Sequence, residues 1–195
     1  VTGSNGKTTV KEMIASIFKE AAGPSHTLMT EGNLNNEIGL PLTLLRLRPE
    51  HQLAVIELGM NHPGETAQLA AIAKANIALI NNAQREHQEF MESIAAVADE
   101  HAAVILALPA DGIAVFPADT PHTSVWKKAA NTRKQIDFAW QREKTEKSSA
   151  VVRGYALKNG AIQIQSPAGE IEVKLQTLGE HNCRNALAAC AVALA

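Results

Sequence analysis

Short, uninterrupted apolar runs separated by amphipathic stretches are the feature that most constrains the fold of this chain. Residues 53–56 and 77–80 contain no polar position, which is typical of strands buried on both faces of a parallel sheet. A helix is predicted between them over about 64–73, a second follows over about 91–108, and 113–116 supplies a further strand. Alternating strands and helices favour right-handed βαβ units, so we predict an α/β fold with a mostly parallel sheet flanked by helices.

A glycine-bearing loop leads directly into the first predicted helix. Apolar side chains recur at helical spacing from Lys7 to about Ala22, and Gly23-Pro24 ends that pattern. The residues before the helix read Gly3-Ser4-Asn5-Gly6-Lys7-Thr8-Thr9. Glycines let successive backbone amides point inward and cradle phosphate oxygens at a helix N-terminus, so we predict a phosphate-binding loop (P-loop) here.

Lys7 and Thr8 would carry the chemistry of this loop. In such loops the lysine reaches the β- and γ-phosphates of a nucleotide, and the hydroxyl that follows binds Mg²⁺. The full pattern begins with one more glycine, whose place Val1 takes, and only Val1-Thr2 remain of the strand that normally precedes the loop. An ordinary turn with a solvated lysine is the alternative, and the helix that follows at once favours nucleotide binding.

The periodicity changes after Trp140. Residues 141–149 are polar and are predicted to form a loop, and beyond them apolar and polar residues alternate over 162–164 and 171–175. Asn159-Gly160 favours a type I′ hairpin turn. We therefore predict a small antiparallel β segment near 150–178, followed by a helix over 183–195.

Two side chains at the ends of predicted strands are candidates for a metal site. Glu57 comes directly after the strand at 53–56, and His87 follows the strand at 77–80 through a polar stretch. Ligands of open α/β sheets bind outside the carboxyl ends of the strands, where a carboxylate is well placed to hold Mg²⁺. A surface carboxylate and a solvated loop histidine are the alternatives.

Asparagines gather in two places. Asn33, Asn35 and Asn36 lie in a polar loop and offer donors and acceptors without charge, which suits a sugar, a uracil or a peptide amide, although loop formation alone is an alternative. A helix is predicted after them, with an apolar face that includes Leu42, Leu44, Leu45 and Leu47. Asn182 and Asn185 open the last predicted helix, where an N-cap role would explain Asn182 but not Asn185.

Composition excludes several classes of protein. A chain of 195 residues with 46% hydrophobic and 19% charged residues is globular rather than disordered, and no apolar run approaches the roughly 20 residues of a membrane span. A net charge of -2 and 4% aromatic residues argue against nucleic acid as a partner. Cys183 and Cys190 are predicted to be reduced thiols, as expected in the cytoplasm.

Five motifs follow one another along the chain. They are TGSNGKTT at 2–9, GNLNNEIGLPLTLL at 32–45, VIELGMNHPGE at 55–65, NNAQREHQEF at 81–90 and GEHNCRNALAA at 179–189. Together they resemble the ATP-dependent Mur ligases of peptidoglycan synthesis, over essentially the whole chain. The asparagine-rich second motif is similar to the branch of that family that adds D-alanyl-D-alanine to UDP-N-acetylmuramoyl-tripeptide.

The resemblance implies an enzyme that forms an amide bond during cell wall biogenesis, on which cell shape and cell division depend. ATP would phosphorylate the carboxylate of the UDP-linked tripeptide, and the amine of D-alanyl-D-alanine would attack the acyl phosphate. The resemblance also implies a role for each matching residue. ATP would be held by Gly3, Ser4, Asn5, Gly6, Lys7, Thr8, Thr9, Asn182 and Asn185; the UDP-substrate by Asn33, Asn35 and Asn36; Mg²⁺ by Thr8, Glu57 and His87; and the catalytic set would be Lys7, Glu57 and His87.

One position departs from the family pattern. Where many members carry a carbamylated lysine that binds a second Mg²⁺, this chain has His101, followed by Ala102 and Ala103 in place of a common Gly-Glu pair. His101 lies seven residues after Ile94, on the apolar face of its helix, so a packed core histidine is the alternative to a metal-site group. A neutral imidazole cannot supply the negative charge of a carbamate, so we expect activity to be independent of bicarbonate.

The resemblance further implies that residues 1–195 are a central ATP-binding domain, without the N-terminal UDP-substrate domain and the C-terminal acceptor domain of the family. We expect a cytoplasmic monomer without membrane insertion that binds ATP and does not ligate by itself. Another Mur ligase or a folylpolyglutamate-type synthetase is an alternative enzyme. A non-catalytic nucleotide-binding module is the alternative of another class, although the guanine-reading Asn-Lys-x-Asp motif of GTPase switches is missing.

Overall fold

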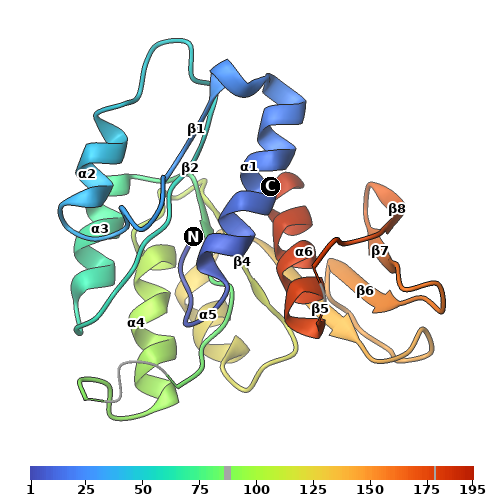
Figure 1. Cartoon of the computed structure of the whole chain (residues 1–195). Helices are drawn as coiled ribbons and strands as arrows, with labels where there is room; N and C mark the ends of the chain where they lie inside the picture. Colours follow the sequence, from blue (N-terminus) through green and yellow to red (C-terminus); the bar gives the residue numbers. More distant parts are fainter. Residues whose placement is uncertain (86–88, 178) are drawn as a thin grey trace.

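A mostly parallel sheet runs through the molecule, with helices on both of its faces (Figure 1). This computed structural model describes residues 1–85, 89–177 and 179–195. The helices are α1 (Lys7–Ala22), η1 (Pro24–His26, a short 3-10 helix), α2 (Gly39–Leu44), α3 (Glu65–Ala73), α4 (Ile94–Leu106), α5 (Thr123–Ala130) and α6 (Glu180–Ala193). The strands are β1 (Thr27–Met29), β2 (Leu53–Val55), β3 (Ile77–Leu79), β4 (Ile113–Pro117), β5 (Lys134–Gln141), β6 (Val152–Ala156), β7 (Ile162–Ser166) and β8 (Gly169–Val173).

The predicted α/β class is confirmed by the strand pairing. β3, β4, β5 and β6 pair in parallel in chain order, and β1 pairs in parallel with β2. The antiparallel segment expected near 150–178 is confirmed as well, and it extends the main sheet: β6 is parallel to β5, whereas β7 and β8 add to it as antiparallel strands.

The first two residues lie between the facing edges of β2 and β3. The Val1 amine donates to Ile56 O at 2.8 Å, and Val1 O accepts from Leu58 N at 2.8 Å. On the other side, Thr2 N donates to Leu79 O at 2.9 Å. This segment therefore joins β1 and β2 to the larger sheet and places the loop that follows it at the carboxyl ends of the strands.

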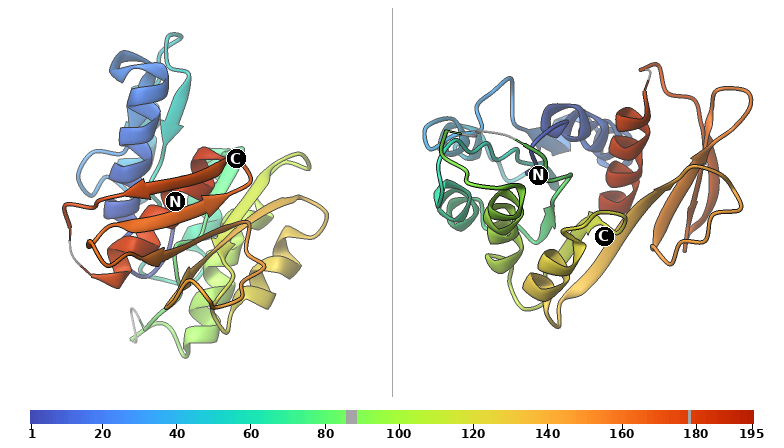
Figure 2. Two further views of the ribbon diagram at one scale, coloured as in Figure 1. Left: turned by 90° about the vertical axis from the view of Figure 1, so that its right-hand side faces the viewer. Right: turned by 90° about the horizontal axis from the view of Figure 1, so that it is seen from below.

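Two apolar layers enclose the sheet. Helices α1 and α6 cover one face, and α3, α4 and α5 cover the other (Figure 2). On β4, Val115 packs with the first layer and Phe116 with the second, and both are fully buried. The predicted burial on both faces is confirmed for β3 and β4, but it is wrong for β2, where Ala54 is exposed.

Helix limits follow from local capping. α1 begins and ends where the sequence predicts, because Gly6 (φ 75°) and Gly23 (φ 96°) adopt backbone conformations outside the helical region at its two ends. α4 begins later than expected, at Ile94, because the Ser93 side chain accepts a 3.1 Å hydrogen bond from Ala96 N and caps the helix.

Three expectations about local structure are wrong. The leucines after the asparagine loop do not form a buried face: α2 is short, and Leu42 and Leu45 are 49% and 81% exposed. Asn182 is not an N-cap, because α6 begins at Glu180 after Gly179. Asn159 has a negative φ and only Gly160 (φ 80°) is left-handed, so the turn between β6 and β7 is not type I′.

Three other elements were not predicted from the sequence. β1 has only three residues, too few for a periodic pattern. In β5, Ile136, Phe138 and Trp140 alternate with other residues and join one core cluster, and in α5 Val125, Trp126, Ala129 and Ala130 have helical spacing, so a signal was present in both. α5 is held by tertiary packing, since Trp126 is fully buried and its Nε1 donates to Ala98 O at 3.0 Å. The two cysteines are unbridged, as expected, and burial raises the pKa of both thiols.

Candidate functional site

The glycine loop stands at the N-terminus of α1 with its backbone turned inward. Gly3 (φ 140°) and Gly6 (φ 75°) both adopt positive φ, which a residue with a side chain rarely does. The Lys7 ammonium bends back over the loop and donates to Gly3 O at 2.6 Å and to Ser4 O at 3.4 Å. Amides at a helix N-terminus together with a lysine directly over them form an anion-binding cradle.

Residues that follow β3 brace this loop. Asn5 N donates to Asn82 Oδ1 at 2.9 Å, while Asn81 Nδ2 and Asn82 Nδ2 donate back to Asn5 O at 2.9 and 2.8 Å. Gln84 N donates to Ser4 Oγ at 2.8 Å. The sequence interpretation missed these residues as loop supports, although two adjacent asparagines at the end of a buried strand were a usable signal.

Asn185 reaches the same loop from α6. Its Oδ1 accepts a 2.8 Å hydrogen bond from Asn81 Nδ2, and its Nδ2 lies 3.4 Å from Asn182 Oδ1. A Cβ added to Gly6 would lie 2.8 Å from Asn185 Oδ1. The asparagines predicted at the start of the last helix therefore lie close to the loop. The short distance between Gly6 and Asn185 explains why a glycine is required at position 6.

Glu57 is the buried acid of the site. It is 2% exposed and follows β2, and its backbone N donates to Thr30 Oγ1 at 2.9 Å. Its Oε1 accepts from Asn35 Nδ2 at 2.8 Å and from Thr8 Oγ1 at 3.3 Å. The loop hydroxyl and the carboxylate that the sequence nominated for a metal site are thus in contact.

The donor set fits Mg²⁺. Glu57 Oε1 contacts Thr8, and Glu57 Oε2 is buried with no hydrogen-bond partner among the described residues, so this oxygen is available to a cation. The described part of the chain holds no group of three or more His, Cys, Asp or Glu side chains suited to a metal. Mg²⁺ is usually bound through one or two carboxylates together with phosphate and water oxygens, so one buried carboxylate next to a phosphate cradle matches its needs.

A buried lysine completes this cluster. Lys11 is fully buried on α1, and its Nζ donates to Thr30 O at 2.8 Å and lies 4.0 Å from Glu57 Oε2. The sequence interpretation did not select it. A signal was present, because Lys11 precedes the apolar residues Ile14 and Phe18 by three and seven positions and so shares their face of the helix.

The asparagine-rich loop separates into three environments. Asn35 is bound to Glu57, and a Cβ on Gly59 would lie 2.9 Å from its amide group. Asn36 Oδ1 accepts from Gly39 N at 2.8 Å at the start of α2. The Asn33 side chain is exposed. Asn33 and Asn36 are therefore both exposed, whereas Asn35 is partly buried and bound to Glu57.

The sequence names two histidines near the predicted metal site, His87 and His101. His87 lies outside the described residues. His101 is fully buried on α4, and its Nδ1 is 3.0 Å from Thr2 Oγ1, directly before the glycine loop. This geometry supports the packed core histidine and places the imidazole behind the loop.

The carboxylate of Glu65, at the start of α3, has a perturbed pKa. Burial alone would raise the pKa of Glu65, but the amides of Asn61 and His62 and the His62 ring donate to it and lower its pKa from the ordinary 4.5. The His62 ring also lies against Phe90, with centroids 4.3 Å apart. The motif at 55–65 therefore ends in an ordered, ionised group.

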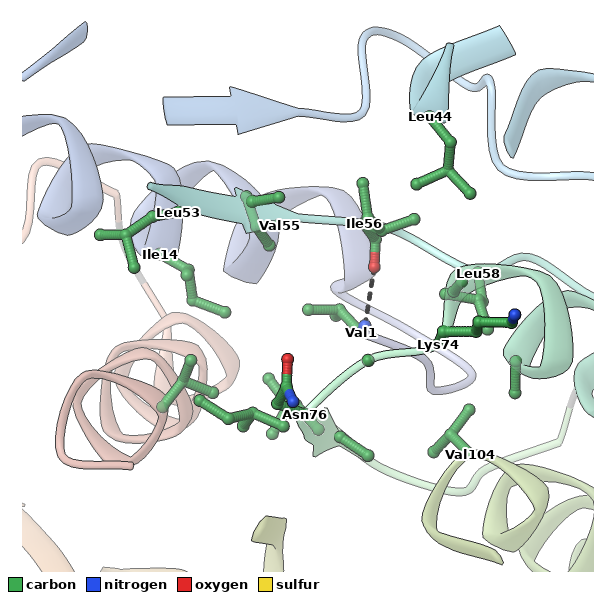
Figure 3. Close-up of a pocket in the computed structure, with 18 of the residues that line it drawn as sticks. Val1, Ile14, Leu44, Leu53, Val55, Ile56, Leu58, Lys74, Asn76 and Val104 are labelled. Atoms are coloured by element: carbon green, nitrogen blue, oxygen red, sulfur yellow. Dashed lines mark hydrogen bonds between the residues drawn. The ribbon is translucent and has the colours of Figure 1, made fainter. Parts of the chain in front are cut away.

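A cavity of about 400 Å³ lies elsewhere, between β2 and β3 beside Val1 (Figure 3). Its walls are mostly apolar and include Ile14, Val55, Ile77 and Val104. None of the residues nominated for nucleotide, metal or substrate lines it. The cavity is therefore separate from the loop and from Glu57.

Comparison with known proteins agrees with the motifs. A family model described as the Mur ligase middle domain matches residues 1–193. A UDP-N-acetylmuramoyl-tripeptide–D-alanyl-D-alanine ligase of Buchnera aphidicola is 42% identical over 194 residues, which make up 100% of this chain and 41% of that protein. The chain spans about two fifths of the length of the curated relatives that it matches.

Solved structures show the same arrangement. A crystal structure of MurF from Acinetobacter baumannii has a TM-score of 0.87 at 34% identity and covers 98% of this chain and 41% of that one. The MurF ligase of Thermotoga maritima, crystallised in complex with ADP, has a TM-score of 0.81 at 26% identity and covers 98% of this chain and 43% of that one. No helix within the described ranges is both long and apolar enough to cross a membrane.

Proposed function

Because this chain belongs to the Mur ligase middle-domain family, we propose that it is the ATP-binding domain of the ligase that adds D-alanyl-D-alanine to UDP-N-acetylmuramoyl-tripeptide in peptidoglycan synthesis. Three relatives that are 40–42% identical to this chain carry that activity in their names. The observation that carries the proposal is the contact between the loop hydroxyl of Thr8 and the buried carboxylate of Glu57, directly beside Lys7.

The proposed reaction forms an amide in two steps. A carboxylate oxygen of the tripeptide attacks the γ-phosphorus of ATP, and ADP leaves. The amine of D-alanyl-D-alanine then attacks the acyl carbon, so that a C–N bond forms, the C–O bond to phosphate breaks, and the amine proton is lost. Phosphoryl transfer of this kind depends mainly on positioning and on stabilising charge at the phosphate oxygens.

The residues of the loop are suited to the first step. Lys7 Nζ, which donates to Gly3 O, lies where it can transfer its hydrogen bonds to the β- and γ-phosphate oxygens. Asn81 and Asn82 hold the loop backbone at Asn5 O, and Asn185 on α6 holds the Asn81 side chain, so the loop amides would be oriented before the nucleotide arrives. The ADP complex of the Thermotoga maritima relative supports a nucleotide at this loop.

Mg²⁺ would be held by Thr8 and Glu57, with His87 as a further candidate from the sequence, and would supply neutralising charge to the phosphates. Asn35 keeps the Glu57 carboxylate in place through its 2.8 Å hydrogen bond. Asn33 is exposed and is proposed to contact the UDP-linked substrate. Asn36 supports the same surface by holding the start of α2.

We further propose a monomer that works in the cytoplasm, where ATP is available and thiols such as the two unbridged cysteines stay reduced. The UDP-substrate and acceptor would be held largely by parts of the ligase outside this domain, since the matched relatives are more than twice as long.

An acceptor screen tests the proposed function. Phosphate release from ATP is measured with UDP-N-acetylmuramoyl-tripeptide and one amine at a time, using the ligase that contains this domain. The proposal expects release with D-alanyl-D-alanine and little with single diamino acids or glutamate. Release with a diamino acid or with glutamate in place of the dipeptide would assign the chain to a different branch of the family.

A further inference from the structure

Lys11 is a fully buried lysine in the middle of the proposed site. Lysines are rarely buried completely unless their charge is paired. The Nζ atom has three neighbours: Thr30 O at 2.8 Å, Glu12 Oε1 at 3.0 Å and Glu57 Oε2 at 4.0 Å. Glu12 is 51% exposed and Glu57 is 2% exposed, so solvent screens the first charge much more than the second.

The arrangement of α1, β1 and β2 places Lys11 next to Glu57. Lys11 lies three residues after Thr8 on α1, so both side chains project from the same side of the helix. Thr30 follows β1 and Glu57 follows β2, and these strands are parallel neighbours, so their carboxyl ends meet. Thr30 connects the two charged residues, because its carbonyl accepts from Lys11 and its hydroxyl accepts from Glu57 N.

The two carboxylate oxygens of Glu57 have different partners. Oε1 accepts hydrogen bonds from Asn35 and Thr8, whereas Oε2 has no hydrogen-bond partner among the described residues and faces the Lys11 ammonium at 4.0 Å. That separation is too long for a hydrogen bond but short for two charges removed from water. Lys11 therefore compensates the charge of Glu57 without occupying Oε2 through a hydrogen bond.

We propose that Lys11 is a positioning residue of the site: its buried ammonium is the permanent counter-cation of Glu57 and keeps that carboxylate in place next to Thr8 until a divalent cation binds with the nucleotide. The inference rests on the proposed function, since it assigns Glu57 to the cation. A purely structural role is the competing explanation, in which Lys11 matters only through its hydrogen bond to Thr30 O and its packing.

A double-variant cycle separates the two explanations. Thermal unfolding is measured without divalent cation or nucleotide for the unchanged protein, Lys11→Met, Glu57→Gln and the double variant. Lys11→Met leaves a buried carboxylate uncompensated and is expected to lower Tm by roughly 10 °C. Tm of the double variant should fall by much less than the sum of the decreases in the two single variants, because neither charge is then left unpaired. Lys19→Met, on the same helix and partly exposed, is the control and should change little.

The second arm repeats the measurement with ADP and Mg²⁺. The cation can take over the compensation of Glu57, so Tm of Lys11→Met should recover by more than the unchanged protein gains. The proposal would be overturned if the Tm decreases of the single variants were additive in the double variant and if ADP with Mg²⁺ raised Tm equally in Lys11→Met and in the unchanged protein. Lys11 would then be a structural residue. If Lys11→Met does not accumulate in folded form, Lys11→Gln replaces it under the same criterion, since glutamine keeps a donor for Thr30 O without the charge.

The two proposals fail in different ways. Absence of any Tm gain of the unchanged protein with ADP and Mg²⁺ would count against nucleotide binding, while the cation-free cycle would still report whether Lys11 and Glu57 are coupled. A gain in the unchanged protein with an additive cycle would count against Lys11 alone.

Discussion

Gly6→Ala is the substitution for which the structure gives the clearest expectation. Gly6 caps α1 at φ 75°, and a Cβ there would lie 2.8 Å from Asn185 Oδ1 and 3.0 Å from Asn81 Nδ2. Real Cβ atoms hardly ever approach other atoms so closely, so both amides must move. The 2.8 Å hydrogen bond between them would then be lost or lengthened.

The expected decrease in the free energy of unfolding of Gly6→Ala has two parts. Alanine in a left-handed conformation costs about 1–2 kcal/mol relative to glycine. Disturbing the buried hydrogen bond between Asn81 and Asn185 adds about 1 kcal/mol. Gly160 is a matched control, because its φ is 80° and nothing lies within 4 Å of an added Cβ. Gly160→Ala should therefore show the first part alone, about 1 kcal/mol less than Gly6→Ala.

The assay combines thermal unfolding with calorimetric titration of ADP in the presence of Mg²⁺. For a chain of this size, about 1 kcal/mol corresponds to roughly 2–4 °C in Tm, so the two variants should differ by that amount. Gly6→Ala should also bind ADP at least about tenfold more weakly, since a loss of about 1.4 kcal/mol is tenfold, while Gly160→Ala should bind normally. Equal ADP affinity in the two variants would refute the claim that the loop backbone forms the cradle.

Two further predictions concern the side chains of His101 and Glu65. His101 is a packed histidine bound to Thr2, so ligation should be unchanged when CO₂ is stripped from the assay, and activity restored by added bicarbonate would contradict this assignment. Glu65 has a pKa lowered below 4.5 in the folded state, so it contributes stability that is present above pH 4.5 and is lost as the pH falls through its folded pKa. Glu65→Gln should therefore unfold at a lower temperature at neutral pH and depend less on pH below about 4.5, as thermal scans at a series of pH values would show, and parallel pH curves for the two proteins would contradict this.

Local signals in the sequence predict much of the scaffold. The limits of α1 follow from helical periodicity between Gly6 and Gly23. The positions of β2 and β3 follow from apolar runs without a polar residue, although only β3 is buried as such a run predicts. The contact between Thr8 and Glu57 follows from a general property of α/β sheets, because the loop and the acid both lie at carboxyl ends of strands.

The remainder depends on packing between distant segments. Helical periodicity predicted an apolar face that includes Leu42 and Leu45, but α2 ends at Leu44 and both of these leucines are exposed. Asn35 and Asn36 looked equivalent in the sequence, yet one is bound to Glu57 and the other to Gly39 N. Lys11 shares the apolar face of α1 in the sequence, but its partners Thr30 and Glu57 come from the ends of β1 and β2 and could not be predicted.

The central claim is that residues 3–9 bind the phosphates of ATP through Lys7. Equilibrium binding of ATP and GTP, measured with Mg²⁺ on the unchanged protein and on Lys7→Ala, tests it most directly. Lys7 is partly exposed and its Nζ contacts only carbonyls of its own loop among the hydrogen bonds of the described residues, so the variant should keep its Tm within a few degrees. The account predicts that the unchanged protein binds ATP in preference to GTP and that Lys7→Ala loses ATP binding while remaining folded. ATP binding of unchanged strength in folded Lys7→Ala, or a preference for GTP, would contradict it.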